Sequence, residues 1–435
     1  MAANPGDRVR LTTRDGDAFE GLLMPRHAFS SEEVHTLKLE SGYNLGLPAT
    51  GAKVEVLEKA KPRTEVLKMP ADDPKKPTIA LLGTGGTIAS FVDYRTGGVH
   101  PATKPEELAA AAPDLFAFAN VRAEVVFNMF SEDMQPDHWA EIARRAAWHL
   151  NHGAKGVVIP HGTDTLGYTA AALAFSLKDL TGPVVLVGSQ RSSDRPSSDA
   201  SMNLLAAARV AATTDLGEVV VVMHETSDDR RCAIHRGVRV RKMHTSRRDA
   251  FQSINVRPLG VVDGEQVRLT QPYRKATKGP VEADARFDER VSMILSYPGL
   301  WPEHLEDVVL KATVIVGTGL GHIARRCLPG IEAVIKKGAH VVMASQCIHG
   351  RVNMNVYSTG RDLLKMGVLP AEDMVPEVAY VKMMWILGHT SDAKDVRRLF
   401  ATNLAGEMGD PTDPRAFGQV RKPELGTLDP EAGPE

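Results

Sequence analysis

Residues 78–90 read Thr78-Ile79-Ala80-Leu81-Leu82-Gly83-Thr84-Gly85-Gly86-Thr87-Ile88-Ala89-Ser90, and this stretch decides the fold. The run from Ile79 to Leu82 is short and entirely apolar, as in a central parallel strand that is buried on both faces. The glycines after it allow positive φ angles or a close approach to a ligand, and a helix beginning soon afterwards would direct free N–H groups at an anion. The pattern predicts an α/β protein with a ligand site at the carboxyl end of this strand.

Two kinds of nucleotide-binding loop can be compared with this first corner (residues 83–87). A dinucleotide site needs glycine at the first, third and sixth positions, but the sixth position counted from Gly83 is Ile88. A Walker loop needs a Gly-Lys-Ser/Thr ending, which does not follow here. The remaining interpretation is a hydroxyl group presented at a strand end, with Thr87 as the candidate nucleophile. A simple tight turn is the structural alternative.

A second corner of the same kind (residues 161–165) ends the stretch Val157-Val158-Ile159-Pro160-His161-Gly162-Thr163-Asp164-Thr165. An apolar run again leads into glycine, threonine and an acid, ahead of an alanine-rich helical stretch. The carboxyl ends of parallel strands meet at one edge of a sheet, so the two corners would lie together there. Two threonines, one followed by Asp164, are what an amide hydrolase without a serine triad would need.

In order and spacing, Thr-Gly-Gly-Thr-Ile-Ala-Ser at 84–90 and His-Gly-Thr-Asp-Thr at 161–165 resemble the two signature motifs of the L-asparaginase family. The resemblance extends over about residues 77–400. It implies an asparaginase-like doubly wound sheet with a smaller α/β domain. It also implies that Thr87 is the nucleophile, that Thr163 and Asp164 belong to a second relay, and that Gly86 contributes to substrate binding.

Lys242 lies in the most charged region of the chain, within Arg241-Lys242-Met243-His244-Thr245-Ser246. This segment resembles the catalytic lysine segment of the asparaginase family, in which Asp164 would hold and orient the ammonium group. A solvent-exposed face is the usual alternative for such a charge run, which includes Arg230, Arg231, Arg236, Arg239, Arg241, Arg247 and Arg248. The match of the other two motifs favours the catalytic role for Lys242.

The same resemblance implies four further site residues. Tyr94 falls where the family places a flexible-loop tyrosine beside its nucleophile, in a polar loop that could close over a substrate; an exposed loop aromatic is the alternative. Ser131 falls where the family holds the substrate's α-carboxylate, whereas Glu132 departs from the family's usual amide and could pair with an α-ammonium group. Equally, Ser131 could cap the following helix, with the charge of Glu132 favouring the N-terminus of that helix. His322 falls in a substrate-binding loop of the domain that the family contributes to a neighbouring subunit, or it is an ordinary loop histidine.

Residues 1–58 alternate in the manner of short antiparallel strands separated by glycine and aspartate turns. They predict a five-stranded barrel of the SH3 or Sm type, with strands identified at Arg8–Thr12, Ala18–Met24, Thr36–Leu39 and Lys53–Leu57. Acidic residues slightly outnumber basic ones and there is no aromatic cluster, so protein docking is favoured over RNA binding. Residues 59–77 contain four prolines and predict a linker.

Composition and periodicity suggest the remaining boundaries. The larger domain is expected to span residues 78–280, with buried strands at Val184–Val187 and Val219–Met223. Residues 289–407 predict the smaller domain and residues 408–435 a proline-rich tail. The helix expected after Ser131 would bury one face, formed by Trp139, Ile142, Ala143, Ala146 and Leu150.

The whole-chain composition excludes several classes of protein. The 435 residues are 43% hydrophobic with a formal charge of −2, which argues against wholesale nucleic-acid wrapping. The first residues form no apolar signal region and no apolar run could span a bilayer, so we expect a cytoplasmic protein without a membrane partner. Neither a metal site nor a cofactor is expected in this chain. Three cysteines without ligand spacing are expected to be buried thiols, namely Cys232, Cys327 and Cys347.

The N-terminal addition distinguishes between possible relatives. A simple asparaginase would begin close to Lys76, whereas a barrel followed by a linker resembles the D-subunit family of archaeal glutamyl-tRNA(Gln) amidotransferases. That resemblance implies ammonia release from glutamine or asparagine, and a homodimeric core within a heterotetramer. It also implies an E subunit that binds Glu-tRNA(Gln) and uses ATP with magnesium to form Gln-tRNA(Gln). Two alternatives are a free-standing cytoplasmic L-asparaginase and a nucleic-acid-binding adaptor with an inert asparaginase core.

Overall fold

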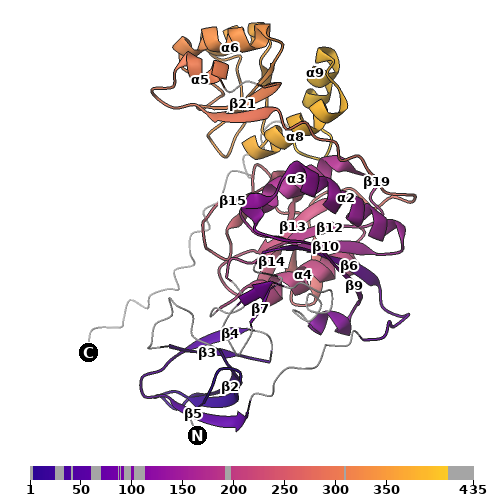
Figure 1. The fold of residues 1–435 in the computed structure, drawn as a ribbon, viewed down its shortest axis with the longest axis vertical. Helices are drawn as coiled ribbons and strands as arrows, with labels where there is room; N and C mark the ends of the chain where they lie inside the picture. Colours follow the sequence, from indigo (N-terminus) through magenta and orange to yellow (C-terminus); the bar gives the residue numbers. More distant parts are fainter. Residues whose placement is uncertain are drawn as a thin grey trace.

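Three parts follow one another along the long axis of the molecule: a small N-terminal sheet, a central α/β domain and a smaller C-terminal α/β domain (Figure 1). They are seen in a computed structural model, which describes residues 3–24, 34–40, 43–59, 70–86, 88, 90–92, 99–101, 113–191, 197–307 and 310–409. The predicted combination of an α/β protein and a small N-terminal β domain is confirmed.

The N-terminal part is a five-stranded antiparallel sheet with the order β4-β3-β2-β1-β5. Its strands are β1 (Arg8–Thr12), β2 (Ala18–Leu23), β3 (Val34–Lys38), β4 (Asn44–Pro48) and β5 (Lys53–Glu58). Strand β4 is not among the strands identified from the sequence, because Gly46 and Pro48 are residues that strands disfavour. A tight turn at Asp15-Gly16 joins β1 to β2, with Gly16 at φ +95°. A small core fills one side of the sheet and consists of Val9, Leu11, Leu23, Leu37 and Leu47.

The central domain is built on an eight-stranded sheet with the order β18-β17-β14-β13-β12-β10-β6-β9. Five strands are parallel: β6 (Thr78–Gly85), β9 (Asn120–Met129), β10 (Gly156–Pro160), β12 (Val184–Val187) and β13 (Val219–His224). Three antiparallel strands extend one edge: β14 (Arg231–Arg236), β17 (Gly260–Asp263) and β18 (Gln266–Leu269). Strands β10, β12 and β13 are buried along their whole length, which explains their continuous apolar sequence.

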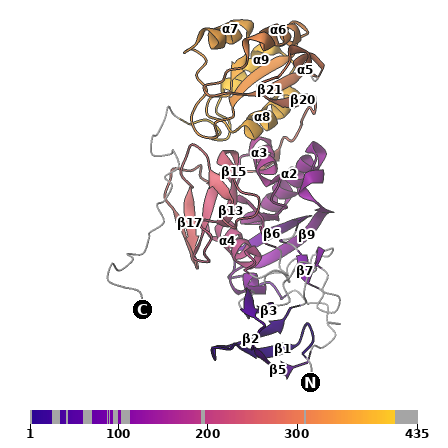
Figure 2. The same cartoon turned by 90° about the vertical axis from the view of Figure 1, so that its left-hand side faces the viewer.

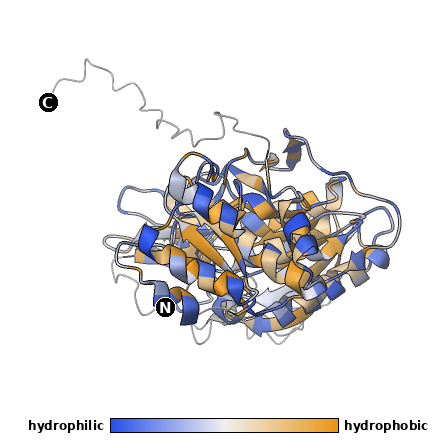
Figure 3. Cartoon of the chain, turned by 90° about the horizontal axis from the view of Figure 1, so that it is seen from above, coloured by the Kyte–Doolittle hydropathy of each residue, from blue (hydrophilic) through white to orange (hydrophobic). Residues whose placement is uncertain are grey.

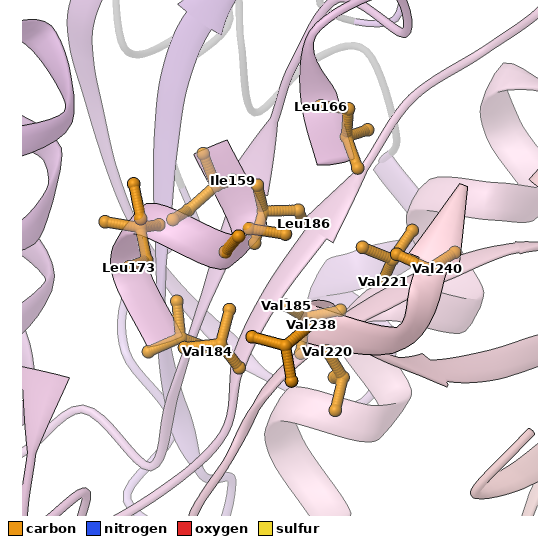
Figure 4. Packing of buried hydrophobic residues seen from close by; sticks show 14 of the residues in the cluster. Ile159, Leu166, Leu173, Val184, Val185, Leu186, Val220, Val221, Val238 and Val240 are labelled. Atoms are coloured by element: carbon orange, nitrogen blue, oxygen red, sulfur yellow. The ribbon is translucent and has the colours of Figure 1, made fainter. Parts of the chain in front are cut away.

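Helices cover both faces of this sheet. Helices α2 (Pro136–Asn151) and α3 (Leu166–Ser176) lie on the side of the C-terminal domain, and α4 (Ala200–Thr213) lies on the other (Figure 1). The predicted inner face of α2 is buried at all five expected residues. Apolar side chains of α3, such as Leu166 and Leu173, share one cluster with valines and leucines of β10, β12 and β13 (Figure 4). Viewed from above, the apolar colour gathers on enclosed strands and inner helix turns, and the hydrophilic colour on the rim (Figure 3).

The C-terminal domain has a four-stranded parallel sheet with the order β20-β21-β22-β23. Its strands are β20 (Val291–Leu295), β21 (Ala312–Gly317), β22 (His340–Ser345) and β23 (Leu369–Pro370). Its helices are α5 (Pro302–Asp307), α6 (Leu328–Lys336), α7 (Ser358–Met366), α8 (Pro376–His389) and α9 (Ala393–Ala401). Helix α8 packs both on this sheet and on α3, so it lies at the junction of the two α/β domains (Figure 2).

Short elements complete the described chain. The two-stranded pairs are β7 (Ser90–Val92) with β8 (Val99–Pro101), β11 (Leu177–Lys178) with β19 (Glu282–Ala283), and β15 (Val240–Lys242) with β16 (Phe251–Ser253). The 3-10 helices are η2 (Pro113–Ala117), η3 (Ser131–Asp133), η4 (Gly237–Arg239) and η5 (Arg325–Cys327). Strand β7 begins soon after the first corner and pairs with β8.

The structure tests two expectations about the whole chain, namely the burial of its cysteines and the lack of a membrane-spanning segment. Cys232 and Cys327 are buried free thiols, but Cys347 is exposed, so the expectation of three buried thiols is wrong for that residue. Cys347 lies in the loop after β22, where the chain leaves the sheet. Among the helices that the structure describes, none is long and apolar enough to cross a membrane.

The N-terminal sheet contacts the central domain through the segment just before α4. The hydroxyl of Tyr43 donates a hydrogen bond to Ser197 Oγ at 3.1 Å, and the Ser197 N–H donates to the Asn44 carbonyl at 2.6 Å. Ser197 adopts φ +56°, a conformation that non-glycine residues rarely take. The contact therefore joins β4 and its preceding turn to a constrained point of the central domain.

A buried ion pair fastens the end of the described chain. Lys382 of α8 and Glu407 are both fully buried, and Lys382 Nζ lies 2.6 Å from Glu407 Oε1. Lys382 also donates to the carbonyls of Phe400 and Thr402 at 2.8 and 2.7 Å. Glu407 accepts from the N–H groups of Leu404 and Ala405. Each charge is thus satisfied by several partners, as burial requires.

We predict that Lys382→Met lowers the free energy of unfolding by about 3–5 kcal/mol, because it leaves the Glu407 carboxylate buried without its counter-charge. Chemical denaturation followed by circular dichroism measures the effect. The control is Lys336→Met, which removes an exposed pair with Glu332 and should change stability by less than about 1 kcal/mol. Equal effects of the two substitutions would contradict the prediction.

Candidate active site

Three predicted site residues form a direct hydrogen-bonded group, which we call the relay group: Thr163, Asp164 and Lys242. Lys242 Nζ, at the end of β15, donates to Thr163 Oγ1 at 2.8 Å and to Asp164 Oδ1 at 2.9 Å. The Lys242 side chain is 16% exposed and that of Asp164 is 69% exposed, so the group opens to solvent on the carboxylate side. Residues almost eighty positions apart in the sequence are thereby brought together, as the motif resemblance predicted.

The first corner touches the second one directly. Thr84 Oγ1 donates to the Pro160 carbonyl at 2.8 Å, which ties the end of β6 to the end of β10. Gly86 has φ +78°, and a Cβ atom there would lie 2.8 Å from the Gly162 nitrogen. Only glycine at this position permits such an approach of two backbones. Thr87 and Tyr94 lie outside the described residues.

Ser131 joins the same place from the end of β9. Its side chain is buried, and a Cβ atom on Gly162 would lie 2.7 Å from Ser131 Cβ and 2.8 Å from its Oγ. Thr165 Oγ1 donates to the Ser131 carbonyl at 2.6 Å. The alternative role as a cap of α2 does not hold, because Gln135 occupies that position. Glu132 is exposed on η3.

His161 holds the second corner through hydrogen bonds of its buried ring, a role that was not expected from the sequence. The ring is fully buried; Nδ1 donates to the Gly162 carbonyl at 2.7 Å, and Nε2 accepts from Thr169 Oγ1 at 2.9 Å. Trp139 Nε1 donates to the same hydroxyl at 3.1 Å. Burial lowers the pKa of His161 to about 4, so the ring is neutral near pH 7 and acts as a structural hydrogen-bonding group.

The hydroxyl groups of Thr84 and Thr165 were also missed as functional positions. Both belong to the quoted motifs, so the signal was present in the sequence. Residue type alone does not tell which threonine of a motif bonds to backbone and which faces the substrate. In the structure, Thr84 and Thr165 fix the mutual positions of three strand ends.

His322 lies in the C-terminal domain, in the loop after β21. Its backbone pairs with Thr318, and its ring contacts Tyr357 edge to face at a centroid distance of 5.2 Å. A Cβ atom on Gly360 would lie 2.9 Å from the ring. These contacts are all within one domain, so within a single chain the structure does not join His322 to the relay group.

The arginine run around Lys242 is not one solvent-exposed face, so that alternative is wrong for several of its members. Arg239 is fully buried and pairs with Asp373 at 2.9 Å. Arg236 is largely buried against Glu218. By contrast, the side chain of Arg230 is 83% exposed. The run divides because buried carboxylates neutralise Arg236 and Arg239, whereas Arg230 pairs with the exposed Asp228.

The loop after Lys242 is closed on itself and tied to β13. The Met243 N–H donates to the Ala250 carbonyl at 2.6 Å. Arg248 Nη1 donates to Asp229 Oδ1 at 2.5 Å, and the same carboxylate oxygen lies 3.3 Å from Nε2 of the buried His224. The chain on the carboxyl side of Lys242 is therefore held by the central sheet.

The arrangement fits proton transfer at a hydroxyl group. Lys242 Nζ, which is itself held by Asp164 Oδ1, contacts Thr163 Oγ1 at the edge of the sheet, where the first corner and Ser131 also converge. A group of this kind can accept a proton from, or return it to, a reacting hydroxyl or water. Among the residues that the structure describes, no three His, Cys, Asp or Glu side chains are grouped as metal ligands.

We predict that Gly86→Ala lowers stability by about 1–3 kcal/mol more than Gly153→Ala, because the new methyl group forces the two corners apart. Gly153 is the matched control: it has φ +88°, close to the +78° of Gly86, but open space where a Cβ would lie. Thermal unfolding of both variants measures the difference. Equal losses would mean that the corners are not in contact.

Comparison with known families covers most of the chain in three segments. Residues 78–275 match the family described as Asparaginase, N-terminal, and residues 290–400 match the Glutaminase/Asparaginase C-terminal domain. Residues 3–57 match the GatD N-terminal domain. In solved structures, the thermostable L-asparaginase from Thermococcus kodakarensis is similar with a TM-score of 0.69 and 34% identity, over 77% of this chain and 99% of that one. L-asparaginase I from Vibrio cholerae gives a TM-score of 0.67 and 29% identity, over 77% and 100%.

Two curated relatives match nearly from end to end. The D subunit of glutamyl-tRNA(Gln) amidotransferase from Thermococcus kodakarensis is 53% identical over 414 residues, which are 93% of this chain and 94% of that protein. The D subunit from Methanothermobacter thermautotrophicus is 48% identical over 94% of both chains. The resemblances stated from the motifs and from the N-terminal addition are thereby confirmed. The chain belongs to the family of glutamyl-tRNA(Gln) amidotransferase D subunits, whose two α/β domains are asparaginase domains.

Proposed function

We propose that this chain is the ammonia-releasing subunit of a tRNA-dependent amidotransferase, and that it hydrolyses the side-chain amide of glutamine or asparagine. The observation that carries the proposal is the relay group, in which Lys242 Nζ contacts both Thr163 Oγ1 and Asp164 Oδ1 beside the first corner. An N-terminal domain of the D-subunit type and nearly full-length D-subunit relatives support the amidotransferase setting.

Amide hydrolysis needs a nucleophile, a proton shuttle and donors for the developing oxyanion. Thr87 Oγ would attack the side-chain amide carbon, while Tyr94 assists removal of the hydroxyl proton. The tetrahedral intermediate would collapse as the protonated amine leaves as ammonia, giving an acyl-threonine ester. Backbone N–H groups of the two glycine corners would stabilise the oxyanion, at roughly 3–4 kcal/mol for each donor.

The relay group would act in both halves of this reaction. In acylation, Thr163 and Lys242 would tune the proton transfer at Thr87, and Asp164 would keep the ammonium group oriented. In deacylation, the same group would activate the water that cleaves the ester and returns a carboxylic acid and free Thr87. Gly86, Ser131 and Glu132 would bind the amino acid backbone of the substrate; the packing of Ser131 and Gly86 on Gly162 supports this for the first two.

The second half of the amidotransferase reaction would belong to a partner. We propose an E subunit that binds Glu-tRNA(Gln), uses ATP with magnesium, and takes up the released ammonia to form Gln-tRNA(Gln). No cofactor is proposed for this chain. We further propose a homodimeric core of D subunits within a cytoplasmic heterotetramer, in which His322 would reach the site of the neighbouring subunit.

The comparisons favour this function over both alternatives. A free-standing asparaginase does not account for an N-terminal domain that matches the D-subunit family. An inert adaptor does not account for an intact relay group, because a partly buried lysine that contacts a threonine and a carboxylate is not needed for binding nucleic acid.

We predict that Lys242→Met lowers kcat for amide hydrolysis by about 10²–10⁴, with a smaller change in KM, because the relay loses its proton donor and acceptor. Ammonia release from glutamine and asparagine by the assembled complex measures it. The matched control is Lys275→Met, which removes an exposed lysine near Asp215, far in sequence from both corners, and should leave kcat unchanged.

The same assay tests the amidotransferase setting. Ammonia release is measured with the chain alone, with its candidate partner, and with partner plus Glu-tRNA(Gln). Strong stimulation by the charged tRNA supports the proposal. Fast asparagine hydrolysis that needs no partner would identify a free-standing asparaginase, and a steep salt dependence of RNA binding without hydrolysis would identify an adaptor.

A further inference from the structure

Strand β15, which carries Lys242, has few backbone hydrogen bonds to hold it, although Lys242 must contact Thr163 and Asp164 at fixed distances. It is three residues long and pairs with β16 in a two-stranded sheet outside the eight-stranded one. On its inner side, Val238 and Val240 belong to the main hydrophobic core, which Figure 4 shows together with Val220 and Val221. Apolar packing fixes the depth of this segment, but it is not directional and does not by itself fix the rotation of β15.

Arg239 attaches the start of this segment to the C-terminal domain. Its guanidinium is fully buried; Nη1 donates to Asp373 Oδ2 at 2.9 Å and to the Asp373 carbonyl at 3.1 Å. Nε donates to the Gly406 carbonyl at 3.0 Å. Asp373 also accepts from the Gly409 N–H at 3.1 Å. One buried carboxylate thus links the central domain, the C-terminal domain and the end of the described chain.

Arg241 makes a second attachment, directly beside Lys242. Arg241 Nη2 lies 2.9 Å from Glu377 Oε1, at the first turn of α8, and the two side chains are 33% and 17% exposed. Arg241 and Lys242 are neighbours on a strand, so their side chains point to opposite faces. One face of β15 is therefore held by a carboxylate of the C-terminal domain while the other presents Lys242 to Thr163 and Asp164.

We propose that Asp373 and Glu377 are positioning residues that hold Lys242 in register with Thr163, so that the C-terminal domain takes part in catalysis within its own chain. Asp373 fixes the position of the segment through Arg239, and Glu377 fixes the rotation of β15 through Arg241. Neither carboxylate touches the relay group. Both act on the geometry of the contacts that Lys242 makes at 2.8 and 2.9 Å.

The expected size of the effect follows from how steeply proton transfer depends on geometry. A displacement of about 1 Å in a catalytic group can cost about 10²-fold in rate. Neutralising Glu377 releases one face of a three-residue strand but leaves Val240 and the pairing with β16 in place. We therefore expect a partial loss that falls on the chemical step and not on substrate binding.

The test rests on the proposed function and uses glutamine hydrolysis by the assembled complex. Glu377→Gln is expected to lower kcat about tenfold with KM changed by less than about twofold, and Glu377→Asp, which keeps the charge, to retain more activity than Glu377→Gln. Asp373→Asn should act in the same direction. Thermal unfolding shows that each variant is folded.

The matched control is Glu332→Gln, because Glu332 lies in the same domain but pairs with the exposed Lys336 on α6. It should leave kcat unchanged. A double-mutant cycle separates positioning from general destabilisation: in a Lys242→Met background, Glu377→Gln should cause no further loss. Equal losses in both backgrounds, or a wild-type kcat for folded Glu377→Gln, would overturn the proposal. A wild-type complex without any amide hydrolysis would instead overturn the proposed function.

Discussion

The contact of the Lys242 ammonium with Thr163 and Asp164 is the interaction on which the rest of this structure depends. It joins β15, which lies outside the eight-stranded sheet, to the end of β10, a buried inner strand of that sheet. A lysine in such a place needs a carboxylate to neutralise it, an acceptor for its remaining protons, and a rigid support. Asp164 and Thr163 provide the first two. The support comes from the hydrophobic core on one side and from arginine–carboxylate pairs on the other.

The glycine corners explain why the reactive groups converge at this edge of the sheet. Parallel strands β6, β9 and β10 end side by side, and side chains on the residues that follow β6 and β10 would collide with neighbouring backbone and side-chain atoms. Gly86 and Gly162 remove that obstacle, so the first corner, the second corner and Ser131 come within van der Waals distance of one another. Threonine hydroxyls then bond across the gaps to carbonyl groups. The corners thus fasten the three strand ends to one another.

The elements that could be predicted from the sequence are those whose residues show a local pattern of apolar side chains. Continuous apolar runs predicted β10, β12 and β13, and a helical period predicted the inner face of α2. The motif resemblance correctly placed Thr163, Asp164 and Lys242 in one group. Residue patterns did not predict β4, because Gly46 and Pro48 are untypical of strands. They did not predict the burial of Arg239 either, because a charged residue becomes buried only through a partner distant in the chain. For the same reason, His161 could not be recognised as a buried support, since its partner Thr169 lies on α3 and Trp139, which bonds to Thr169, lies on α2.

The two threonine motifs have unequal roles in the proposed mechanism: Thr87 would attack the amide, and Thr163 would serve the relay. The most direct test is to trap the nucleophile with a diazoketone analogue of glutamine and to locate the adduct by peptide mass spectrometry. The mechanism predicts one adduct per chain on Thr87, formed rapidly in the wild-type complex and much more slowly in Lys242→Met. An adduct on Thr163, or equal rates in the two proteins, would contradict it.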